Sequence, residues 1–505
     1  MPRVHAGDRG SANLVGWALA ALLMLLLIAQ AFKGIDPQDE GQFLTYPWLM
    51  ALGRVPYRDI WMSYPPATYA LMVPFMKLGL PGLATERTLG ILLRVFYILL
   101  VNRLVAGSWR RFSPVAFAAT FSLVYLASDA KLYPWIVALP LPVLGLIVLR
   151  DRPYGAALLF FAGGLFRFEF AVAGLVALLA AALLGPHSRA RYLAAAGVVA
   201  AASVLFYAGL DVWTAGAAFR DIFVDQIVTV QRGRYIPLAD VYLPFLALVF
   251  PVFAATVVLP LGVFIAGLRG GRRWMTASSA GVLVLLPHTL QRFDTSHVFS
   301  TAALVIPWGL IMLTRLRRGE PAAAGMRLTR AVTGGVAVVT VWATALALAF
   351  AVYLSPLSPW GPEPASHLTQ LIVTGKQTII ADDVEEARGD RAVVAYLGRH
   401  AAPGDSLLIL PASLASNYTR TDLYFVIGLH PAGRYLEVQP GLERQASVQR
   451  EMIRTLRHTT WVLLLRGGRW YGPSRGEPET AVDRYDPRHF RPVLRTPIYE
   501  LVHRR

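Results

Sequence analysis

Long apolar runs separated by short basic clusters make up most of the first 354 residues. The first run covers residues 13–32, and we predict further helices near residues 88–107, 113–128, 132–149, 154–167, 170–185, 191–210, 241–268, 274–290, 298–314 and 331–354. Several of these runs approach the roughly 20 residues that an α-helix needs to cross a bilayer. The pattern therefore predicts an α-helical multi-pass membrane protein with about eleven transmembrane helices.

The first apolar run also has an alternative interpretation, a cleaved signal peptide. The run is long for the apolar region of a signal peptide, and the sequence after it, Ala31-Phe32-Lys33-Gly34, is a weak cleavage site. We therefore predict that residues 13–32 form the first transmembrane helix, with the N-terminus in the cytoplasm.

Basic residues mark the ends of many predicted helices. The clusters are Arg110 with Arg111, Arg150 with Arg152, Arg189 with Arg191, Arg269 with Arg272 and Arg273, and Arg315, Arg317, Arg318, Arg327 and Arg330. Cytoplasmic loops of bacterial membrane proteins carry such an excess of arginine and lysine. Only +3 of the net charge of +17 lies beyond residue 354. The charge therefore indicates membrane topology and argues against a nucleic-acid partner.

Composition narrows the class of protein further. Hydrophobic residues make up 55% of the 505 residues, and charged residues make up 16%, against about 25% in an ordinary soluble domain. The chain has no cysteine, so it holds no disulfide, thiolate metal site or cysteine nucleophile. These facts exclude a soluble enzyme, a disordered chain and a disulfide-rich secreted module.

One apolar stretch, residues 66–80, is too short to cross a membrane and contains Pro74 and Lys77. If this stretch crossed the membrane, every later basic cluster would lie on the non-cytoplasmic side, where such clusters are not expected. We therefore predict a helix on the outer membrane surface, inside one long outward-facing loop of residues 34–87. The other outward-facing segments in this topology are residues 128–131, 211–240 and 291–297.

The composition changes after residue 354. Residues 355–364 are rich in proline and serine and predict a linker. Beyond it, the pattern predicts helices at residues 391–400 and 444–457 and strands at residues 406–410, 424–427 and 461–465. Alternating short strands and helices are typical of an α/β domain. Residues 365–505 are therefore predicted to form a C-terminal α/β domain on the exoplasmic face.

An acidic stretch, Asp36-Pro37-Gln38-Asp39-Glu40-Gly41-Gln42, directly follows the first predicted helix. Carboxylates at a membrane boundary are often a solvated helix end, and they also suit the first turn of a following helix. A further set of motifs follows this stretch. It is Gly53-Arg54-Val55-Pro56-Tyr57-Arg58-Asp59-Ile60, then Tyr64-Pro65-Pro66 and the predicted surface helix.

This ordered set resembles the first outer loop of the GT-C superfamily of membrane glycosyltransferases, which includes polyprenyl-phosphate-sugar-dependent enzymes of the protein-mannosyltransferase and lipid A aminoarabinose-transferase type. The resemblance is strongest over residues 34–80 and 291–307. It implies that residues 1–354 form a GT-C-like transmembrane catalytic domain. It also implies an inverting transfer of a sugar from a polyprenyl-phosphate-linked donor to a hydroxyl acceptor on the non-cytoplasmic face, the acceptor being a glycan, a lipid or a protein.

The catalytic carboxylate of this superfamily lies in the first outer loop, and Asp39 occupies the matching position. Inverting transfer needs a base within hydrogen-bond reach of the acceptor hydroxyl. We therefore predict Asp39 as the base, with Glu40 orienting it or binding sugar hydroxyls. The leaving phosphate needs cations near it. Candidates on the outer face are Arg58, Lys131, Arg232, Arg234 and Arg292, although most arginines and lysines at helix ends only reach toward the interface.

Two further groups are candidates for substrate binding. Asp129 matches the second acidic residue that many GT-C enzymes place in the next outer loop. Arg167 and Glu169 interrupt an apolar region, where an ionisable pair indicates function unless the pair lies in a short interfacial turn. Tyr64 of the first outer loop is also predicted to contact substrate.

Residues 291–297 lie before the last-but-one predicted helix. They include a cationic side chain, Arg292, a hydrogen-bond acceptor, Asp294, and a titratable ring, His297. We predict that these three bind substrate. His288, near the end of a predicted helix, is given no role. A divalent cation is left open, since Asp36, Asp39, Glu40 and Asp129 could supply oxygen ligands.

Two other classes of protein remain as alternatives. A transporter or lipid flippase predicts inverted repeats, which the sequence does not show. A non-enzymatic envelope-assembly protein predicts outer loops that tolerate the loss of charge. The sequence favours an enzyme of the plasma (inner) membrane that meets a polyprenyl-phosphate sugar, an acceptor and the bilayer.

Overall fold

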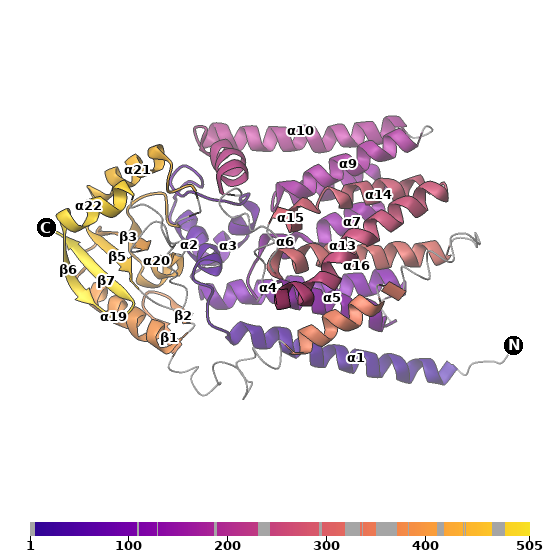
Figure 1. Ribbon diagram of the computed structural model, residues 1–505, viewed down its shortest axis with the longest axis horizontal. Helices are drawn as coiled ribbons and strands as arrows, with labels where there is room; N and C mark the ends of the chain where they lie inside the picture. Colours follow the sequence, from indigo (N-terminus) through magenta and orange to yellow (C-terminus); the bar gives the residue numbers. More distant parts are fainter. Residues whose placement is uncertain are drawn as a thin grey trace. The chain divides into compact units, whose positions relative to one another are not determined.

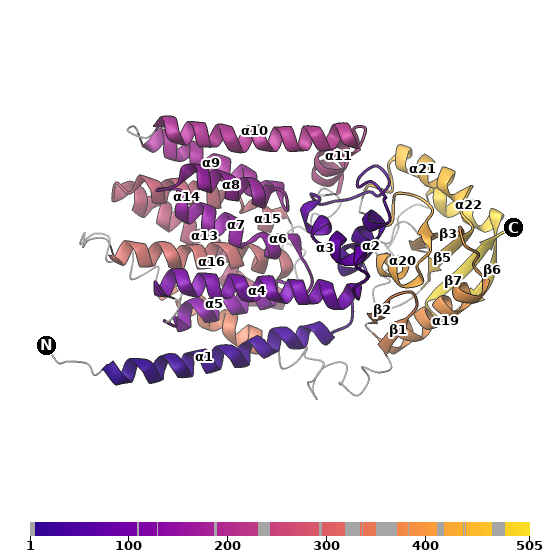
Figure 2. The same cartoon turned by 180° about the vertical axis from the view of Figure 1, so that it is seen from behind.

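The computed structural model describes residues 6–108, 111–128, 130–185, 189–230, 243–291, 295–318, 334–335, 337–349, 371–381, 383–411, 419–437, 439, 441–466 and 480–505. The chain divides into two compact units, and each unit gathers several chain segments (Figures 1 and 2). Unit 1 contains residues 1–31, 89–206 and 236–355, and unit 2 contains residues 32–88, 207–235 and 356–505.

Unit 1 is built from helices that run side by side (Figure 1). Their bounds are α1 Ala6–Ala29, η1 Gln30–Phe32, α4 Gly82–Ala106, α5 Pro114–Ala127, α6 Pro134–Ala138, α7 Pro140–Val148, α8 Pro153–Gly164, α9 Phe168–Leu184, α10 Arg189–Trp213, α13 Leu243–Arg269, α14 Arg273–Leu283, α15 Pro287–Gln291 and α16 Thr295–Arg318. Helices α5 to α8 each begin with proline, which suits the first turn because its missing N–H would have no intrahelical acceptor there. The last residues of η1 and α10 and the first residues of α4 belong to unit 2.

Within the described residues, five helices are long and apolar enough to cross a membrane, judged by length and composition. They are Leu14–Phe32, Gly82–Ala106, Arg189–Trp213, Val249–Arg269 and Ser296–Arg315, and shorter apolar helices include Pro114–Ala127, Pro134–Val148, Pro153–Gly164, Phe168–Leu184 and Ala337–Ala349. The predicted predominantly helical architecture with several apolar helices is confirmed. The number of eleven crossings stays a prediction.

Helix α16 lies at the centre of unit 1. Of its apolar window 89% is buried within the protein, against 22% for the window of α10, whose apolar side chains point outward. Polar groups inside the helical core find partners: Trp308 of α16 donates its Nε1–H to Ser278 Oγ over 2.8 Å, and Tyr97 of α4 donates to the carbonyl of Ala303 over 2.6 Å. Such pairing avoids the cost of an unsatisfied polar group in an apolar interior.

Unit 2 contains a five-stranded sheet in the order β4-β3-β5-β7-β6. The strands are β3 Ser406–Pro411, β4 His430–Pro431, β5 Trp461–Leu465, β6 Phe490–Arg495 and β7 Tyr499–Arg504. Strand β3 runs parallel to β4 and β5, whereas β7 is antiparallel to both β5 and β6. A separate hairpin pairs β1 Ile372–Thr374 with β2 Thr378–Ile380.

Helices cover both faces of this sheet. The side chains of Leu408, Leu410, Val462, Leu464 and Val502 on one face pack against α21 Ala446–Leu456 and α22 Ala481–His489. On the other face, Trp461 contacts Tyr396, and Tyr499 donates to Asp390, both from α19 Val384–His400 (Figure 1). The predicted C-terminal α/β architecture is therefore present, with β3, β5, α19 and α21 close to their predicted positions.

The prediction of a strand at residues 424–427 is wrong. These residues belong to a helix, α20 Thr421–Ile427, which ends at Gly428 in the left-handed conformation. A short, fully buried apolar run suits a strand and a helix equally, so periodicity does not distinguish them. Glycine at this position stops the helix because it adopts a positive φ without strain.

The first outer loop supplies two helices to unit 2, α2 Asp39–Ala51 and α3 Ala67–Lys77. Helix α3 lies inside the stretch predicted as a surface helix and is only 11 residues long. Unit 2 also includes α11 Ala217–Phe219 and the π-helix η3 Arg220–Val230. The domain boundaries predicted at residues 354 and 364 fall in residues that the structure does not describe and stay predictions.

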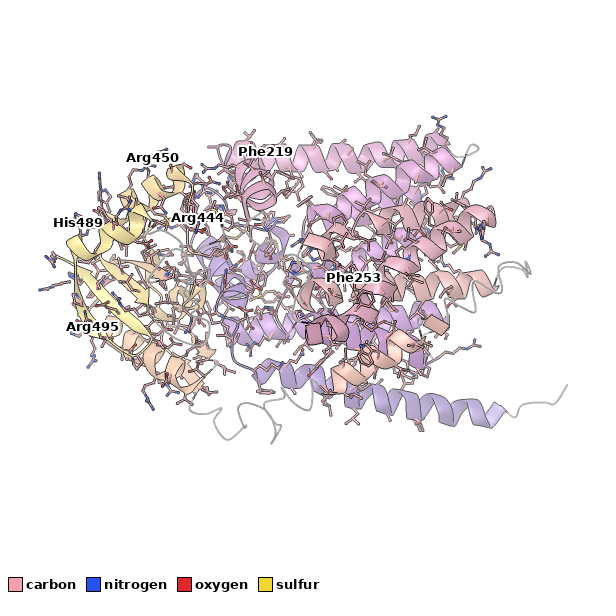
Figure 3. The ribbon with its side chains drawn as sticks, in the orientation of Figure 1. Phe219, Phe253, Arg444, Arg450, His489 and Arg495 are labelled. Carbon is pink, nitrogen blue, oxygen red and sulfur yellow. The ribbon has the colours of Figure 1, made fainter. Side chains whose placement is uncertain are left out.

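Polar and basic side chains lie exposed on unit 2, as Arg450, His489 and Arg495 illustrate in Figure 3. Phe253 of unit 1, labelled in the same figure, packs instead against the apolar core of the helices. This contrast agrees with the change of composition after residue 354.

Candidate active site

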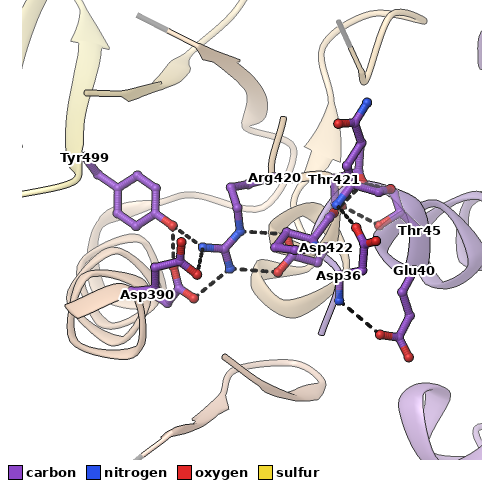
Figure 4. Close-up of polar contacts among 11 residues, drawn as sticks. Asp36, Glu40, Thr45, Asp390, Arg420, Thr421, Asp422 and Tyr499 are labelled. Atoms are coloured by element: carbon purple, nitrogen blue, oxygen red, sulfur yellow. Dashed lines mark hydrogen bonds and ion pairs between the residues drawn. The ribbon is translucent and has the colours of Figure 1, made fainter. Parts of the chain in front are cut away.

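The acidic stretch after α1 forms the capped start of helix α2. The Asp36 carboxylate accepts hydrogen bonds from the backbone N–H groups of Gln38 and Asp39, over 3.2 and 2.9 Å. The Glu40 carboxylate in turn accepts from the Asp36 N–H over 3.2 Å (Figure 4). This reciprocal arrangement satisfies N–H groups that have no partner inside the helix. It fixes the backbone on both sides of Asp39, whose side chain is partly exposed.

Glu40 is buried and forms an ion pair with Arg87. Its exposed fraction is 2%, and the Arg87 guanidinium donates to its two carboxylate oxygens over 2.6 and 2.8 Å. Arg87 also donates to the carbonyls of Lys33 and Gly34. One guanidinium therefore holds together the two ends of the first outer loop, and paired charges are the form in which ionised side chains persist inside proteins.

A second polar contact of α2 involves the C-terminal domain. Gln42 donates its side-chain N–H to the carboxylate of Glu437 and accepts a hydrogen bond from the Tyr69 hydroxyl of α3 over 3.1 Å. All three side chains are buried. Burial raises the pKa of Tyr69 well above its usual value, with the charges of Glu437 and Asp39 contributing, so its hydroxyl stays a donor. The face of α2 beside Asp39 is thus lined with fixed polar groups.

Two other predicted residues of unit 2 lie farther along the loop. The side chain of Arg58 is 53% exposed and pairs with Asp59, Nε to Oδ1, over 2.9 Å. That guanidinium is the main reason why the pKa of Asp59 is lowered. The backbone carbonyl of Tyr64 accepts from the buried Tyr57 hydroxyl over 2.8 Å. Asp39, Glu40, Arg58 and Tyr64 therefore all belong to unit 2.

Lys131 belongs to a turn of unit 1 that Arg94 holds in place. The buried Arg94 guanidinium donates to the carbonyls of Gly90, Ala130 and Lys131 over 2.9, 3.2 and 2.8 Å, and to Ser128 Oγ over 2.6 Å. Lys131 itself is 8% exposed. A buried arginine that binds three carbonyls makes this turn a defined feature of the structure.

Arg167 and Glu169 form the centre of a second polar cluster in unit 1. Arg167 NH2 lies 2.6 Å from Glu169 Oε1 and 3.4 Å from Nδ1 of His288. His288 stacks on Trp135, with ring centroids 4.0 Å apart, and its ring lies 4.7 Å from that of His297. The structure therefore brings together three predicted residues, Arg167, Glu169 and His297, around a histidine to which the sequence had given no role.

The remaining predicted residues, Asp129, Arg232, Arg234, Arg292 and Asp294, lie outside the described residues. Lys131, Arg167, Glu169 and His297 belong to unit 1. No group of three or more histidine, aspartate or glutamate side chains arranged to hold a metal ion occurs among the residues that the structure describes.

Sequence reasoning missed several residues that organise these clusters, namely Arg87, Arg94, Gln42 and Glu437. For Arg87 a signal existed, because Glu86 and Arg87 are charged residues at the start of an otherwise apolar run. Gln42 and Glu437 are 395 residues apart, and no local pattern relates two such distant positions.

A buried carboxylate with a raised pKa lies where η3 meets the C-terminal domain. Asp221 accepts two hydrogen bonds from Arg434, over 2.5 and 2.6 Å. Burial raises the pKa of Asp221 to about 7, and the guanidinium of Arg434 opposes part of this shift. An unfolded chain would release this proton near pH ~3.9.

The stability of the protein should therefore depend on pH through Asp221. Between about pH 4 and 7 the folded state binds more protons at Asp221 than the unfolded state, so the contribution of this group to stability falls as the pH rises. We expect the stability of the wild type relative to Asp221→Asn to decline from pH 4 to pH 7 and then to level off. Unfolding midpoints of the two detergent-purified proteins, measured from pH 4 to 8, check this. A difference that is constant with pH would contradict the assignment.

Comparisons with known proteins identify the fold. No protein-family model and no curated protein sequence matches the chain. Among solved structures, it is similar to the crystal structure of ArnT from Cupriavidus metallidurans bound to undecaprenyl phosphate, with a TM-score of 0.54 and 12% sequence identity over 97% of each chain. The apo structure of the same protein gives a TM-score of 0.56 at 12% identity and the same coverage. The chain therefore has an ArnT-like fold, as its resemblance to the lipid A aminoarabinose-transferase type predicts.

Proposed function

We propose that this chain is a membrane glycosyltransferase that moves a sugar from a polyprenyl-phosphate-linked donor to a hydroxyl acceptor. The fold supports the proposal, because one of the similar ArnT structures contains undecaprenyl phosphate and the similarity extends over 97% of both chains. Fold alone does not define chemistry. The proposal therefore depends on the residues at the start of α2.

The observation that carries it is the arrangement of three carboxylates there. Asp36 caps the helix and Glu40 is buried against Arg87, so both serve the structure, whereas Asp39 between them is partly exposed. Asp39 also lies in the first turn of α2, where the helix dipole favours the ionised form of a carboxylate. A carboxylate that is held in place and partly exposed is what a general base requires.

In the proposed step, Asp39 accepts the proton of the acceptor hydroxyl. The acceptor oxygen then bonds to the anomeric carbon on the face opposite the phosphate, while the bond between that carbon and the phosphate oxygen breaks. The electron pair leaves with the polyprenyl phosphate, so the configuration at the sugar is inverted. Cations near the leaving phosphate would stabilise its charge.

For that role we propose Arg58, Lys131 and Arg292, with Tyr64, Asp129, Arg167, Glu169, Asp294 and His297 as further substrate-binding residues. Glu40 orients Asp39 by its contact with Asp36. Asp36 Oδ1 already accepts two backbone N–H groups, and both oxygens of Glu40 accept from Arg87, so these two carboxylates serve the local structure.

We further propose that the protein crosses the plasma (inner) membrane about eleven times, with a cytoplasmic N-terminus and an exoplasmic C-terminal domain. In this topology the first outer loop faces the exoplasmic side, where a glycan, lipid or protein acceptor is available.

Transfer by the purified protein in nanodiscs tests the proposal. Isotope-labelled undecaprenyl-phosphate monosaccharides are offered one at a time with an extract of envelope glycans, lipids and proteins. We expect one donor to release undecaprenyl phosphate and to label one acceptor class, with the opposite anomeric configuration in the product.

The same assay separates the alternatives. Movement of an intact labelled lipid across proteoliposomes without cleavage would identify a flippase. If no donor binds and none is cleaved, the enzyme assignment is wrong, and a role in envelope assembly is favoured.

A further inference from the structure

The C-terminal domain makes direct hydrogen bonds to the backbone immediately before Asp39. The Thr421 hydroxyl of α20 contacts the carbonyls of Pro37 and Gln38, over 2.8 and 3.0 Å (Figure 4). The backbone N–H of Asp422 also donates to the Pro37 carbonyl over 3.3 Å. In the opposite direction, Thr45 of α2 donates to the Thr421 carbonyl over 2.6 Å. We call this set of bonds the Thr421 clamp.

The two elements approach each other too closely for any other side chain at Gly41. A Cβ atom on Gly41 would lie 2.5 Å from Thr421 Oγ and 2.6 Å from the Asp422 nitrogen, closer than such contacts normally permit. Thr421 and Thr45 are fully buried. The interface between α2 and α20 is thus a close-packed, buried contact, in which a hydrogen bond defines position well.

Thr421 is itself held rigidly, because both of its neighbours in sequence are locked. Arg420 NH2 lies 2.7 Å from Asp390 Oδ2 and 2.8 Å from Asp422 Oδ2. Tyr499 of β7 donates to Asp390 Oδ1 over 2.6 Å (Figure 4). The position of Thr421 is therefore set by α19 and by the sheet of the C-terminal domain, and not by a surface loop.

The other side of the acidic stretch is attached to the same domain. The Ile35 N–H donates to the Ile380 carbonyl of β2 over 2.7 Å. Residues 35, 37, 38 and 45 are thus bonded to β2 or α20, so Asp39 has attached residues on both sides along the chain. A carboxylate that must meet an acceptor hydroxyl within hydrogen-bond distance depends on such positioning, since a 1 Å displacement can cost roughly 100-fold in rate.

We infer that Thr421 is a positioning residue for transfer, and that the C-terminal domain forms part of the catalytic centre by holding Asp39 through the Thr421 clamp. The inference rests on the proposed function of Asp39 as the base. It assigns to the C-terminal domain a task in the chemical step itself, through the backbone of α2.

Thr421→Val tests the inference, because valine keeps the shape of threonine and removes the hydroxyl. We expect kcat to fall by about 10- to 100-fold with the KM for the lipid-linked donor changed less than about 2-fold. Thr421→Ser keeps the hydroxyl and should restore at least half of the activity. Thr459→Val is the matched control, since Thr459 is equally buried in the same domain but its hydroxyl bonds only to the Thr455 carbonyl.

Hydrogen exchange of the wild type and the variants tests the clamp without any activity. In Thr421→Val the amides of residues 38–42 should exchange at least about 10-fold faster than in the wild type, and in Thr459→Val they should not. Thr45→Val removes the reciprocal bond from α2 and provides a second variant should Thr421→Val fold poorly. We expect it to give the same faster exchange and the same fall in kcat.

The two proposals fail in distinguishable ways. Suppose that the wild type transfers no sugar while the amides of residues 38–42 exchange faster in Thr421→Val than in the wild type. In that case the proposed function is wrong and the clamp exists. If the wild type transfers sugar and Thr421→Val keeps the kcat and the protection of the wild type, the positioning role is overturned.

Discussion

Replacing Asp39 by asparagine is expected to lower kcat for sugar transfer by about 10²–10⁴-fold, the usual contribution of a general base. Asparagine has nearly the same shape, and the Asp36 cap binds the backbone of residue 39, not its side chain. The fold should therefore survive, while the group that accepts the proton is lost. Single-turnover release of polyprenyl phosphate at saturating donor measures the effect, with the unfolding midpoint as a check on folding.

Asp151→Asn is the matched control for this experiment. Asp151 is 72% exposed, and its carboxylate lies 3.7 Å from Arg150, so neither rate nor stability should change. If the rate of sugar transfer by Asp39→Asn is within about 3-fold of the wild-type rate, Asp39 is not the base.

Replacing Arg420 by methionine is expected to destabilise unit 2 by about 3–5 kcal/mol. The side chain of Arg420 is 1% exposed and is shared between Asp390 and Asp422, each of which is completely buried. Burial raises the pKa of Asp422 to about 6, although Arg420 opposes this shift. Without the guanidinium, two neighbouring buried carboxylates would have to be protonated or exposed to water, and either change costs folding free energy.

Denaturant unfolding followed by the fluorescence of Trp461 and its neighbours in the C-terminal domain measures this loss. The control is Arg399→Met, because Arg399 is exposed and donates only to a carbonyl of its own helix. That variant should stay within about 0.5 kcal/mol of the wild type. If Arg420→Met lowers the free energy of unfolding by less than about 1 kcal/mol, Asp390 and Asp422 do not need the charge of the arginine in the folded state.

Much of the fold could be predicted from the sequence where a local pattern carries the information. Apolar runs between arginines located the helices of unit 1, because the length of an apolar helix is set by the bilayer. A continuous apolar run gave β5 at Trp461–Leu465 correctly. The same criterion failed for α20, because a buried segment of seven residues shows no helical period.

The candidate site could be predicted only in part, for a physical reason. The carboxylates after α1 are a local signal, and so is the short helix that follows them. Their partners are not local: Glu40 pairs with Arg87, Gln42 with Glu437 and Gly41 packs against Thr421. Each of these contacts depends on which distant segments the fold brings together, and one sequence contains no record of that.

The assembly of unit 2 from chain segments far apart in sequence has a consequence for the order of events during synthesis. Thr421 bonds to a carbonyl 384 residues earlier in the chain. At ~5–20 residues per second, the ribosome needs about 20–80 s to make the intervening chain. Throughout that time the Asp39 helix lacks the domain that holds it, so the Thr421 clamp forms only after the apolar helices that precede residue 421 have been made.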